Sequence, residues 1–550
     1  MLDRRTLADA RPGDLAVART GRGRARVERV IGPAEAIETV LEGLLVEEGA
    51  RTEFEPYEQP EPRAEGRVDL RHELAFTIDP ETAKDFDDAL TFAPRAEGVR
   101  ALVHIADVSA FVPAGSALDH GAAGRAFSTY VPGTVAPMLP PELADDACSL
   151  RPDVDRFCVT VEIPLDESFD PGEPSVYRSV IRSRARLTYG QAEAILRGRE
   201  PAEPALAQAL SLAEQVATAL RERRYRRGAL RIESGEIAFA FDGRGGVERA
   251  WREAEPHAHM LVEELMILAN EAVAQLLAGR RREALYRVHE RPDPQAVELL
   301  LAKLADLGVP TPPAPDREQL SPAEAARLAS AASECVSGYV ARAQRGREAF
   351  PALVLRSLKQ ARYDPRNLGH SGLASSAYCH FTSPIRRYPD LVCHRALLRE
   401  LGISDEPLPD ELPELAEHAS ARERAAGELE YRADEICLAW LLERVLFERG
   451  WEEPFEGEIT GAIGSGLFVR FGEVFEGYLP ARRLAGDYFE LNELGTAVVG
   501  RRGGGTFRLG DPIEVRVQEI RRAEGKVELG PASGPGERRR PRARVSRRSR

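Results

Sequence analysis

Four aspartates fall within ten consecutive positions, among apolar neighbours rather than in a polar run: Asp79, Asp85, Asp87 and Asp88. Two carboxylates about 4 Å apart repel each other by roughly 4 kcal/mol at an effective dielectric constant near 20. A protein that gathers several carboxylates usually holds a cation between them, and hard oxygen ligands favour Mg²⁺ or Mn²⁺ over zinc. Two interpretations of this stretch are open, a divalent-metal site and a solvated acidic loop.

A second dense stretch begins at Tyr378 and ends at Tyr388, and it carries Phe381, Arg386 and Arg387. A Ser-Pro pair fixes a turn just before the two arginines. Adjacent guanidinium groups flanked by aromatic rings suit phosphate contact and base stacking. Arginines in an acidic protein also suit structural ion pairs. The stretch therefore indicates either a nucleic-acid contact or a set of internal salt bridges.

The chain has 550 residues, which is enough for about three or four folded units. It is 43% hydrophobic and 30% charged, without an apolar run near 18 residues, so we expect a globular protein that does not span a membrane. The first residues lack the apolar core of a secretory signal, and we expect a cytoplasmic location. Six scattered cysteines without a Cys-x-x-Cys pair argue against a zinc site or a disulfide framework.

The net charge of -14 is unevenly distributed. Residues 535–550 contain eight arginines and one glutamate, so this tail carries +7 and the remainder carries -14 - 7 = -21. An acidic body does not suit a protein that coats nucleic acid with its whole surface, so any RNA should enter a confined basic groove. Two roles for the tail are equally open: a disordered end that keeps the protein soluble, and a segment that gathers RNA.

Four units are expected along the chain, with boundaries at 1–66, 67–450, 451–531 and 532–550. The first is a small N-terminal domain with strands near 12–19 and 25–31, a helix near 37–44 and a Pro- and Glu-rich linker. A reduced nucleic-acid-binding module and a structural cap both fit it. The last is the basic tail, expected to be disordered.

The second unit is a large mixed domain. Its stretch 101–108 is nearly all apolar and predicts a buried strand, while 260–277, 296–307 and 414–448 show helical patterns. In the third unit, short alternating strands punctuated by glycine predict a small β-barrel. Phe468 and Phe471 are candidate base-stacking rings there, but a regular strand points them to opposite faces, so at most one should be exposed.

The two dense stretches together resemble the ribonuclease II / ribonuclease R (RNB) family, through Asp79-x5-Asp85-x-Asp87-Asp88-Ala89 and His380-Phe381-Thr382-Ser383-Pro384-Ile385-Arg386-Arg387-Tyr388. Further matches follow in the family's order at 104–109, 130–133, 137–140, 148–150, 263–266 and 286–289. The resemblance covers roughly residues 70–450, and the terminal barrel resembles the family's S1 domain. It implies an α+β multidomain fold, with a central mixed α/β catalytic domain, a C-terminal OB-type barrel and a small N-terminal domain.

The resemblance implies a processive hydrolytic exoribonuclease that works from the 3′ end of single-stranded, and in some members structured, RNA and releases nucleoside 5′-monophosphates. The four aspartates would surround Mg²⁺ (or Mn²⁺), with Asp79 and Asp88 as the better ligand candidates. Asp85 and Asp87 would ligate or position the attacking water, and Arg386 would be the catalytic arginine. Tyr130 and Tyr189 match tyrosines along the path of the 3′-terminal nucleotides, and Glu430 matches a family acidic residue in an altered local motif.

Two departures from the family pattern stand out. Ile232 occupies the position where the family commonly has a phenylalanine that stacks on the last base. The usual pair of leading cold-shock barrels is missing or reduced, because 66 residues are too few for two barrels. The sequence therefore leaves open whether duplex RNA is handled as by ribonuclease II, which stalls, or as by ribonuclease R, which unwinds it.

Three functions compete. The first is the active exoribonuclease, a monomer whose partner is RNA with a free 3′ end. The second is an RNA-binding or regulatory protein that keeps the fold without the chemistry, and the third is an endonuclease or DNA nuclease. The four aspartates and Arg386 are all present, which favours the first over the second. The barrel and the ordered motifs argue against the third.

Overall fold

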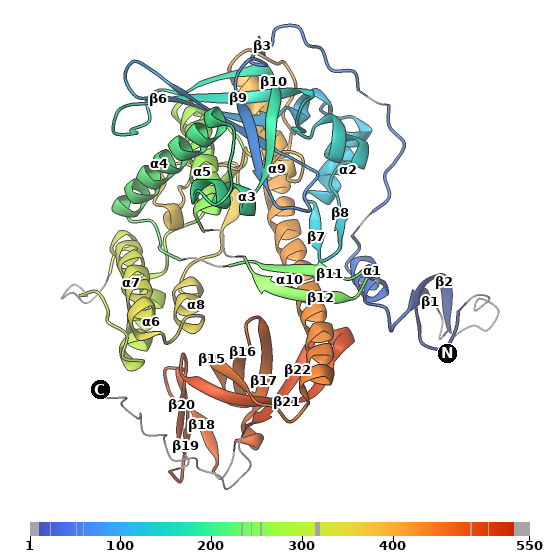
Figure 1. Ribbon diagram of the computed structural model, residues 1–550, viewed down its shortest axis with the longest axis vertical. Coiled ribbons are helices and arrows are strands. Elements are labelled where there is room, and N and C mark those ends of the chain that lie inside the picture. Colours follow the sequence, from blue (N-terminus) through green and yellow to red (C-terminus); the bar gives the residue numbers. More distant parts are fainter. Residues whose placement is uncertain are drawn as a thin grey trace.

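The computed structural model describes residues 10–21, 24–50, 52–58, 60–232, 235–243, 245–253, 256–313, 320–484, 487–503 and 505–532. A large body of helices around a sheet is joined to a small barrel by one long helix (Figure 1). The expected basic tail, from residue 533 onward, lies outside the described residues.

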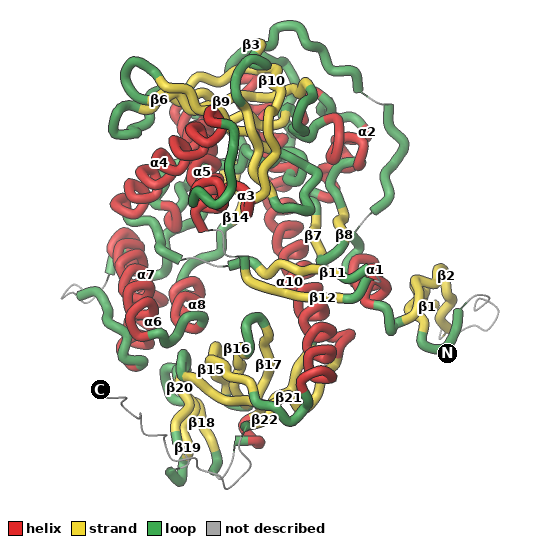
Figure 2. The backbone as a smooth tube through the Cα atoms, viewed as in Figure 1, coloured by secondary structure: helices red, strands yellow, loops and turns green. Residues whose placement is uncertain are grey.

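The leading unit is a hairpin of β1 (Asp14–Gly21) and β2 (Arg24–Pro33) followed by helix α1 (Ile37–Glu47). Both predicted strands and the predicted helix are confirmed. Arg432 of the long helix forms ion pairs with Glu47 and Glu48 at the end of α1. The linker is a long loop along the outside of the central domain (Figure 2), and Phe54 within it lies under the guanidinium of Arg125, 4.2 Å away.

The central sheet has six strands in the order β3-β10-β4-β5-β6-β9. Their bounds are β3 (Val68–Asp69), β4 (Ala75–Asp79), β5 (Asp88–Pro94), β6 (Val99–Ala106), β9 (Asp155–Leu165) and β10 (Ser175–Thr188). The early part of β10 pairs antiparallel with β9, and its late part pairs parallel with β4. One long strand thereby closes the sheet on itself.

Helices cover both faces of this sheet, because alternate residues of each strand point to opposite sides. Val103 and Ile105 of β6 pack in one core with α4 (Pro204–Arg227) and α5 (Pro256–Gly279). Leu102 and Ala106 pack in a second core with α2 (Ala117–Arg125) and α9 (Tyr388–Glu400). The nearly all-apolar stretch 101–108 therefore contains a strand buried on both faces, as predicted.

Smaller elements complete the central domain. They are β7 (Thr129–Val131), β8 (Thr134–Ala136), α3 (Tyr189–Leu196), β11 (Ile237–Phe241), β12 (Val247–Arg252), β13 (Tyr286–Val288), α6 (Pro294–Asp306), α7 (Pro322–Ala343), α8 (Ala349–Arg356) and β14 (Arg362–Asp364). The predicted helices at 260–277 and 296–307 correspond to α5 and α6. The predicted one or two helices at 414–448 form one 38-residue helix, α10 (Leu412–Arg449), roughly 57 Å long.

The C-terminal unit is a closed barrel in the order β15-β16-β17-β22-β21, which confirms the predicted barrel. Its strands are β15 (Phe455–Ile463), β16 (Gly466–Phe471), β17 (Phe475–Pro480), β21 (Pro512–Arg521) and β22 (Lys526–Pro531). Between β17 and β21 the chain adds a separate sheet of β18 (Phe489–Leu491), β19 (Ala497–Gly500) and β20 (Thr506–Arg508), which the sequence patterns did not indicate. Across the described residues, no helix combines the length and apolarity needed to cross a membrane.

Arg395 of α9 is buried in the second core with 1% of its surface exposed. Its Nη1 lies 2.8 Å from Asp119 Oδ1 of α2, and its Nη2 donates a hydrogen bond of 2.7 Å to the carbonyl of Val112. The hydroxyl of Tyr388 donates to the same Asp119 oxygen at 2.9 Å. This network fixes α9, the helix that directly follows the Arg386-Arg387 pair, against α2.

We expect Arg395→Met to lower the free energy of unfolding by about 3–5 kcal/mol, because it leaves the buried Asp119 carboxylate without its cation. Urea denaturation followed by circular dichroism measures this change. Arg521→Met is the matched control, since Arg521 pairs with Glu519 on an exposed barrel strand and its loss should leave the midpoint unchanged. Equal midpoints for the two variants would contradict a stabilising role of the buried pair.

Candidate active site

Asp79 and Asp88 are brought together by adjacent strands. Asp79 ends β4 and Asp88 begins β5, and the antiparallel register pairs Phe76 with Leu90. Continued by two residues, this register places Ile78 opposite Asp88, next to Asp79. Burial raises the pKa of both carboxyls, and their mutual repulsion contributes at Asp88. The pair is therefore a buried concentration of negative charge.

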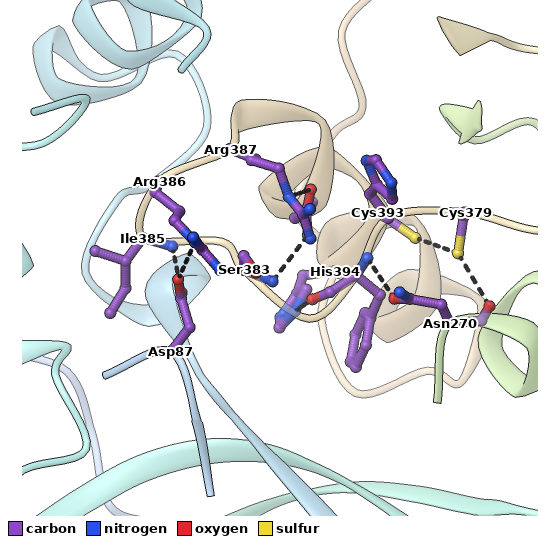
Figure 3. Close-up of polar contacts among 12 residues, drawn as sticks. Asp87, Asn270, Cys379, Ser383, Ile385, Arg386, Arg387, Cys393 and His394 are labelled. Atoms are coloured by element: carbon purple, nitrogen blue, oxygen red, sulfur yellow. Dashed lines mark hydrogen bonds and ion pairs between the residues drawn. The ribbon is translucent and has the colours of Figure 1, made fainter. Parts of the chain in front are cut away.

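The side chain of Asp87 points toward the second dense stretch of the sequence, residues 378–388. Its Oδ1 accepts a 2.8 Å hydrogen bond from the backbone N–H of Ile385, and its Oδ2 lies 3.3 Å from Nε of Arg386 (Figure 3). Asp87 itself is almost fully buried, whereas 47% of the Arg386 side chain is exposed. Two motifs 298 residues apart meet at this carboxylate.

Ser149 sets the path of the loop that carries these aspartates. Its Oγ accepts a hydrogen bond from the N–H of Phe86 at 3.0 Å and donates one to the carbonyl of Lys84 at 2.6 Å. The N–H of Leu150 donates to the carbonyl of Phe86 at 2.9 Å. Sequence reasoning assigned Ser149 no role, although it lies in one of the matching family motifs.

Tyr130 connects Asp85 to Glu430. Its hydroxyl donates a 2.5 Å hydrogen bond to Asp85 Oδ2, and its backbone N–H donates a 2.7 Å bond to Glu430 Oε1. Glu430 lies on α10, and burial raises the pKa of its carboxyl. The structure thus brings both Tyr130 and Glu430, predicted from separate motifs, to the acidic loop.

Tyr189 lies next to the pair of carboxylates formed by Asp79 and Asp88. It opens α3 directly after Thr188, and Thr188 pairs with Asp79 in the parallel register of β10 and β4. Burial and the charges of Asp88 and Asp79 raise the pKa of the Tyr189 hydroxyl. The ring of Tyr189 stacks on that of His259 of α5, a residue that the sequence did not single out.

A dense set of hydrogen bonds holds the segment that presents Arg386 (Figure 3). Asn270 of α5 accepts from the N–H of Phe381 at 2.9 Å and donates to the Tyr378 hydroxyl at 3.0 Å. His394 Nε2 lies 2.8 Å from the carbonyl of Phe381. Further along, the N–H of Ser383 donates to Asp390 Oδ1 at 2.8 Å and the N–H of Ser128 donates to the carbonyl of Arg386 at 2.9 Å.

Three residues of this segment, Tyr378, Phe381 and Tyr388, are core residues in the structure, and their prediction as RNA contacts is corrected. Phe381 is fully buried and stacks on His394 at 4.1 Å, and Tyr388 and Tyr378 are buried with their hydroxyls bonded to Asp119 and Asn270. Arg387 makes bonds of 3.0 and 2.7 Å to Asp390. The ion-pair interpretation therefore fits Arg387, which stays partly exposed, and its role as an RNA contact stays a prediction.

In the barrel, Phe468 is 38% exposed and Phe471 is fully buried. This outcome follows from their opposite orientation on β16. Phe471 packs against Phe455 and Phe475 in the barrel core, so its prediction as a base-stacking ring is wrong. Phe468 instead faces Tyr478 of β17, with ring centroids 5.4 Å apart, and Tyr478 joins it as a candidate ring that the sequence reasoning overlooked.

The donor set at the acidic loop suits a hard divalent cation. Asp79 Oδ2 is buried and has no hydrogen-bond partner among the described residues. Asp88 lies beside it, and the excess negative charge on the pair is the condition that a cation relieves. No cluster of three or more His, Cys, Asp or Glu side chains in the described chain is already close enough to hold a metal ion. The residues therefore fit Mg²⁺ in type and charge, and the ligand set stays a prediction.

A closed mixed sheet with buried carboxylates facing an arginine, joined by one helix to a small barrel, defines a multidomain α/β protein. The RNB domain family matches residues 67–402, and the chain belongs to this family. Ribonuclease R of Escherichia coli (strain K12) is 36% identical over 491 residues, which are 86% of this chain and 58% of that relative. The chain thus spans less than two thirds of the length of this relative.

Two solved structures share the fold. RNase R of Mycoplasma genitalium, in complex with ribose-methylated single-stranded RNA, has a TM-score of 0.87 at 24% identity, covering 96% of this chain and 85% of that one. Yeast Ssd1, described as a pseudonuclease, has a TM-score of 0.67 at 17% identity, covering 88% of this chain and 62% of that one. The predicted central domain with its RNB-type fold is confirmed.

We expect Asn270→Leu to lower the free energy of unfolding by about 1–3 kcal/mol, because the N–H of Phe381 loses its acceptor in a buried site. Chemical denaturation measures the change. Tyr378→Phe is the control: it removes only the hydroxyl that Asn270 contacts and should have a smaller effect. A Tyr378→Phe variant less stable than Asn270→Leu would contradict Asn270 as the centre of this network.

Proposed function

We propose that this chain is a hydrolytic exoribonuclease that degrades RNA processively from the 3′ end to nucleoside 5′-monophosphates with Mg²⁺. The observation that carries the proposal is the contact of Asp87 with both Ile385 and Arg386, beside the Asp79 and Asp88 pair. Buried carboxylates next to a partly exposed guanidinium combine a site for a cation with a positive charge for phosphate. The relatives named ribonuclease R support the same reaction.

Hydrolysis of a phosphodiester requires a nucleophile and relief of the negative charge that builds on the phosphoryl group. Asp79 and Asp88 would hold the divalent ion, which supplies Lewis acidity and makes water a stronger acid. Asp85 and Asp87 would complete the ligand set or orient the attacking water. Arg386 would place fixed positive charge at the phosphoryl oxygens, an effect of roughly 3–4 kcal/mol for a well-placed donor.

Asp87 has a second role in this scheme, since it orients the arginine. Its carboxylate binds both the Ile385 backbone and Arg386 Nε, so the guanidinium is aimed before the substrate enters. Groups that are already oriented need no rearrangement in the transition state. Tyr130 would act likewise, holding Asp85 while its ring borders the path of the RNA.

The barrel would guide the single strand toward the site. Phe468 and Tyr478 form an adjacent pair of rings on neighbouring strands, and such pairs stack bases without reading sequence. We propose RNA with a free 3′ end as the partner of a monomeric, cytoplasmic enzyme. We propose that the enzyme handles duplex RNA as ribonuclease R does, because the named relatives are ribonucleases R. A duplex with a 3′ overhang tests this proposal, by whether digestion enters the paired region.

A second candidate is an RNA-binding protein without nuclease activity. Yeast Ssd1 carries the fold and is described as a pseudonuclease, so the fold alone does not decide the matter. This chain keeps Asp79, Asp85, Asp87, Asp88 and Arg386, and it keeps them in mutual proximity around one loop. That arrangement favours the enzyme.

We expect the wild-type protein, with Mg²⁺ and RNA labelled at its 5′ end, to shorten the RNA progressively from the 3′ end and to leave the matching DNA intact. Asp87→Asn and Arg386→Lys should each reduce the rate roughly 100- to 1,000-fold: the first removes the carboxylate that orients the arginine, and the second replaces the planar guanidinium fork with a single ammonium group that Asp87 cannot orient in the same way. Denaturing electrophoresis of timed samples measures both the product length and the rate.

Asp170→Asn is the matched control, since Asp170 is an exposed aspartate paired with Arg223 away from the site. It should digest RNA at the wild-type rate, and EDTA should stop wild-type digestion until Mg²⁺ is restored. Internal cuts would show an endonuclease. Undiminished cleavage by Asp87→Asn would overturn the assigned mechanism.

We expect Phe468→Ala to weaken binding of single-stranded RNA about 5- to 100-fold, the range that the loss of one stacking ring gives, without a change in thermal stability. Phe471→Ala should instead lower the stability of the barrel by about 3–5 kcal/mol through loss of a core ring. Fluorescence anisotropy and thermal melting separate the two effects. A stability loss at Phe468 as large as that at Phe471 would contradict its assignment as a binding ring.

A further inference from the structure

The rings of Tyr189 and His259 form a parallel stack at the acidic end of β4. Their centroids are 3.8 Å apart and their planes differ by 12°. Aromatic pairs in proteins more often adopt offset or edge-to-face arrangements. Among the described residues one other ring pair, Phe381 with His394, is stacked in this way, and that pair is fully buried in the core.

His259 differs from the buried pair in its exposure. Its side chain is 36% exposed, although Tyr189 covers one face of the imidazole. Glu253, just after β12, lies at the edge of the ring, with its Oε2 3.2 Å from Nε2. One face and one edge are thus occupied, so a further stacking partner would use the second face of the ring.

The stack lies beside the proposed metal site. Thr188 pairs with Asp79, so Tyr189 and the ring that stacks on it are adjacent to the carboxylates that, in the proposed mechanism, face the phosphate of the last nucleotide. Tyr130 is held on the Asp85 side through both its hydroxyl and its backbone. Ile232 is aliphatic and packs partly buried against the hydrophobic core, so it supplies no stacking face.

We propose that His259, supported from behind by Tyr189 and with Glu253 at its edge, is the stacking platform for the 3′-terminal nucleobase. The inference rests on the proposed exoribonuclease function and assigns a residue to the recognition of the terminal nucleotide. A flat ring that stacks without a hydrogen-bond pattern accepts every base, which suits an enzyme that must remove each nucleotide in turn.

The test compares two RNAs and a set of variants in the Asp87→Asn background, so that RNA is bound but not cleaved. One RNA ends in a complete nucleotide, and the other ends in an abasic ribose. The variants are His259→Ala, His259→Phe and the control His257→Ala, an exposed histidine two positions earlier on α5 that pairs with Glu214. Fluorescence anisotropy in Mg²⁺ gives the Kd of each pair.

We expect His259→Ala to raise the Kd for the complete RNA about 5- to 100-fold and to leave the Kd for the abasic RNA unchanged. His259→Phe should restore binding of the complete RNA, and His257→Ala should match the parent on both. If His259→Ala proves unstable in thermal melting, His259→Leu takes its place, since it fills the same space without a π face.

An equal loss on both RNAs, or no loss on either, would overturn the assignment of His259. The proposed function is tested separately by digestion with the protein that retains Asp87. If that protein leaves the 5′-labelled RNA undigested, the exoribonuclease function fails. If it digests the RNA while the His259 variants bind both RNAs like the parent, the function stands and only the platform fails.

Discussion

The ion pair and hydrogen bond at Asp87 are the constraint on which the site depends. A carboxylate that is almost fully buried must be satisfied by partners inside the protein, because leaving it unpaired costs several kcal/mol. Asp87 finds those partners in Ile385 and Arg386. Docking of the acidic loop against the arginine segment therefore supplies the partners of this carboxylate.

A comparison with Asp107 shows what is distinctive about Asp79 and Asp88. Asp107 is fully buried, and Arg67 lies 2.7 Å and Arg178 2.9 Å from its Oδ2. Burial acts to raise the pKa of Asp107, yet the two arginines hold it below its usual value. Asp79 and Asp88 have no comparable compensation, and the pKa of each is raised. The first arrangement stabilises the fold, whereas the second leaves a negative charge that suits a cation.

Helix α10 connects this chemistry to the rest of the molecule (Figure 1). It supplies Glu430 to the backbone of Tyr130, pairs through Arg432 with the end of α1, and pairs through Glu443 with Arg522 of the barrel at 2.8 Å. A single rigid helix thus sets the position of the leading hairpin and of the barrel relative to the acidic loop.

The sequence by itself identified the four aspartates and the arginine as candidate site residues and predicted the main strands and helices, because these inferences follow from residue type and local periodicity. It also predicted that Phe468 and Phe471 would face opposite ways. Tertiary structure decided which of them is exposed, that Phe381 and Tyr388 are core residues, that Arg387 pairs with Asp390, and that Tyr478 and His259 lie at candidate RNA-binding positions. Those outcomes depend on which side chains packing buries, and packing brings together residues hundreds of positions apart that no local pattern connects.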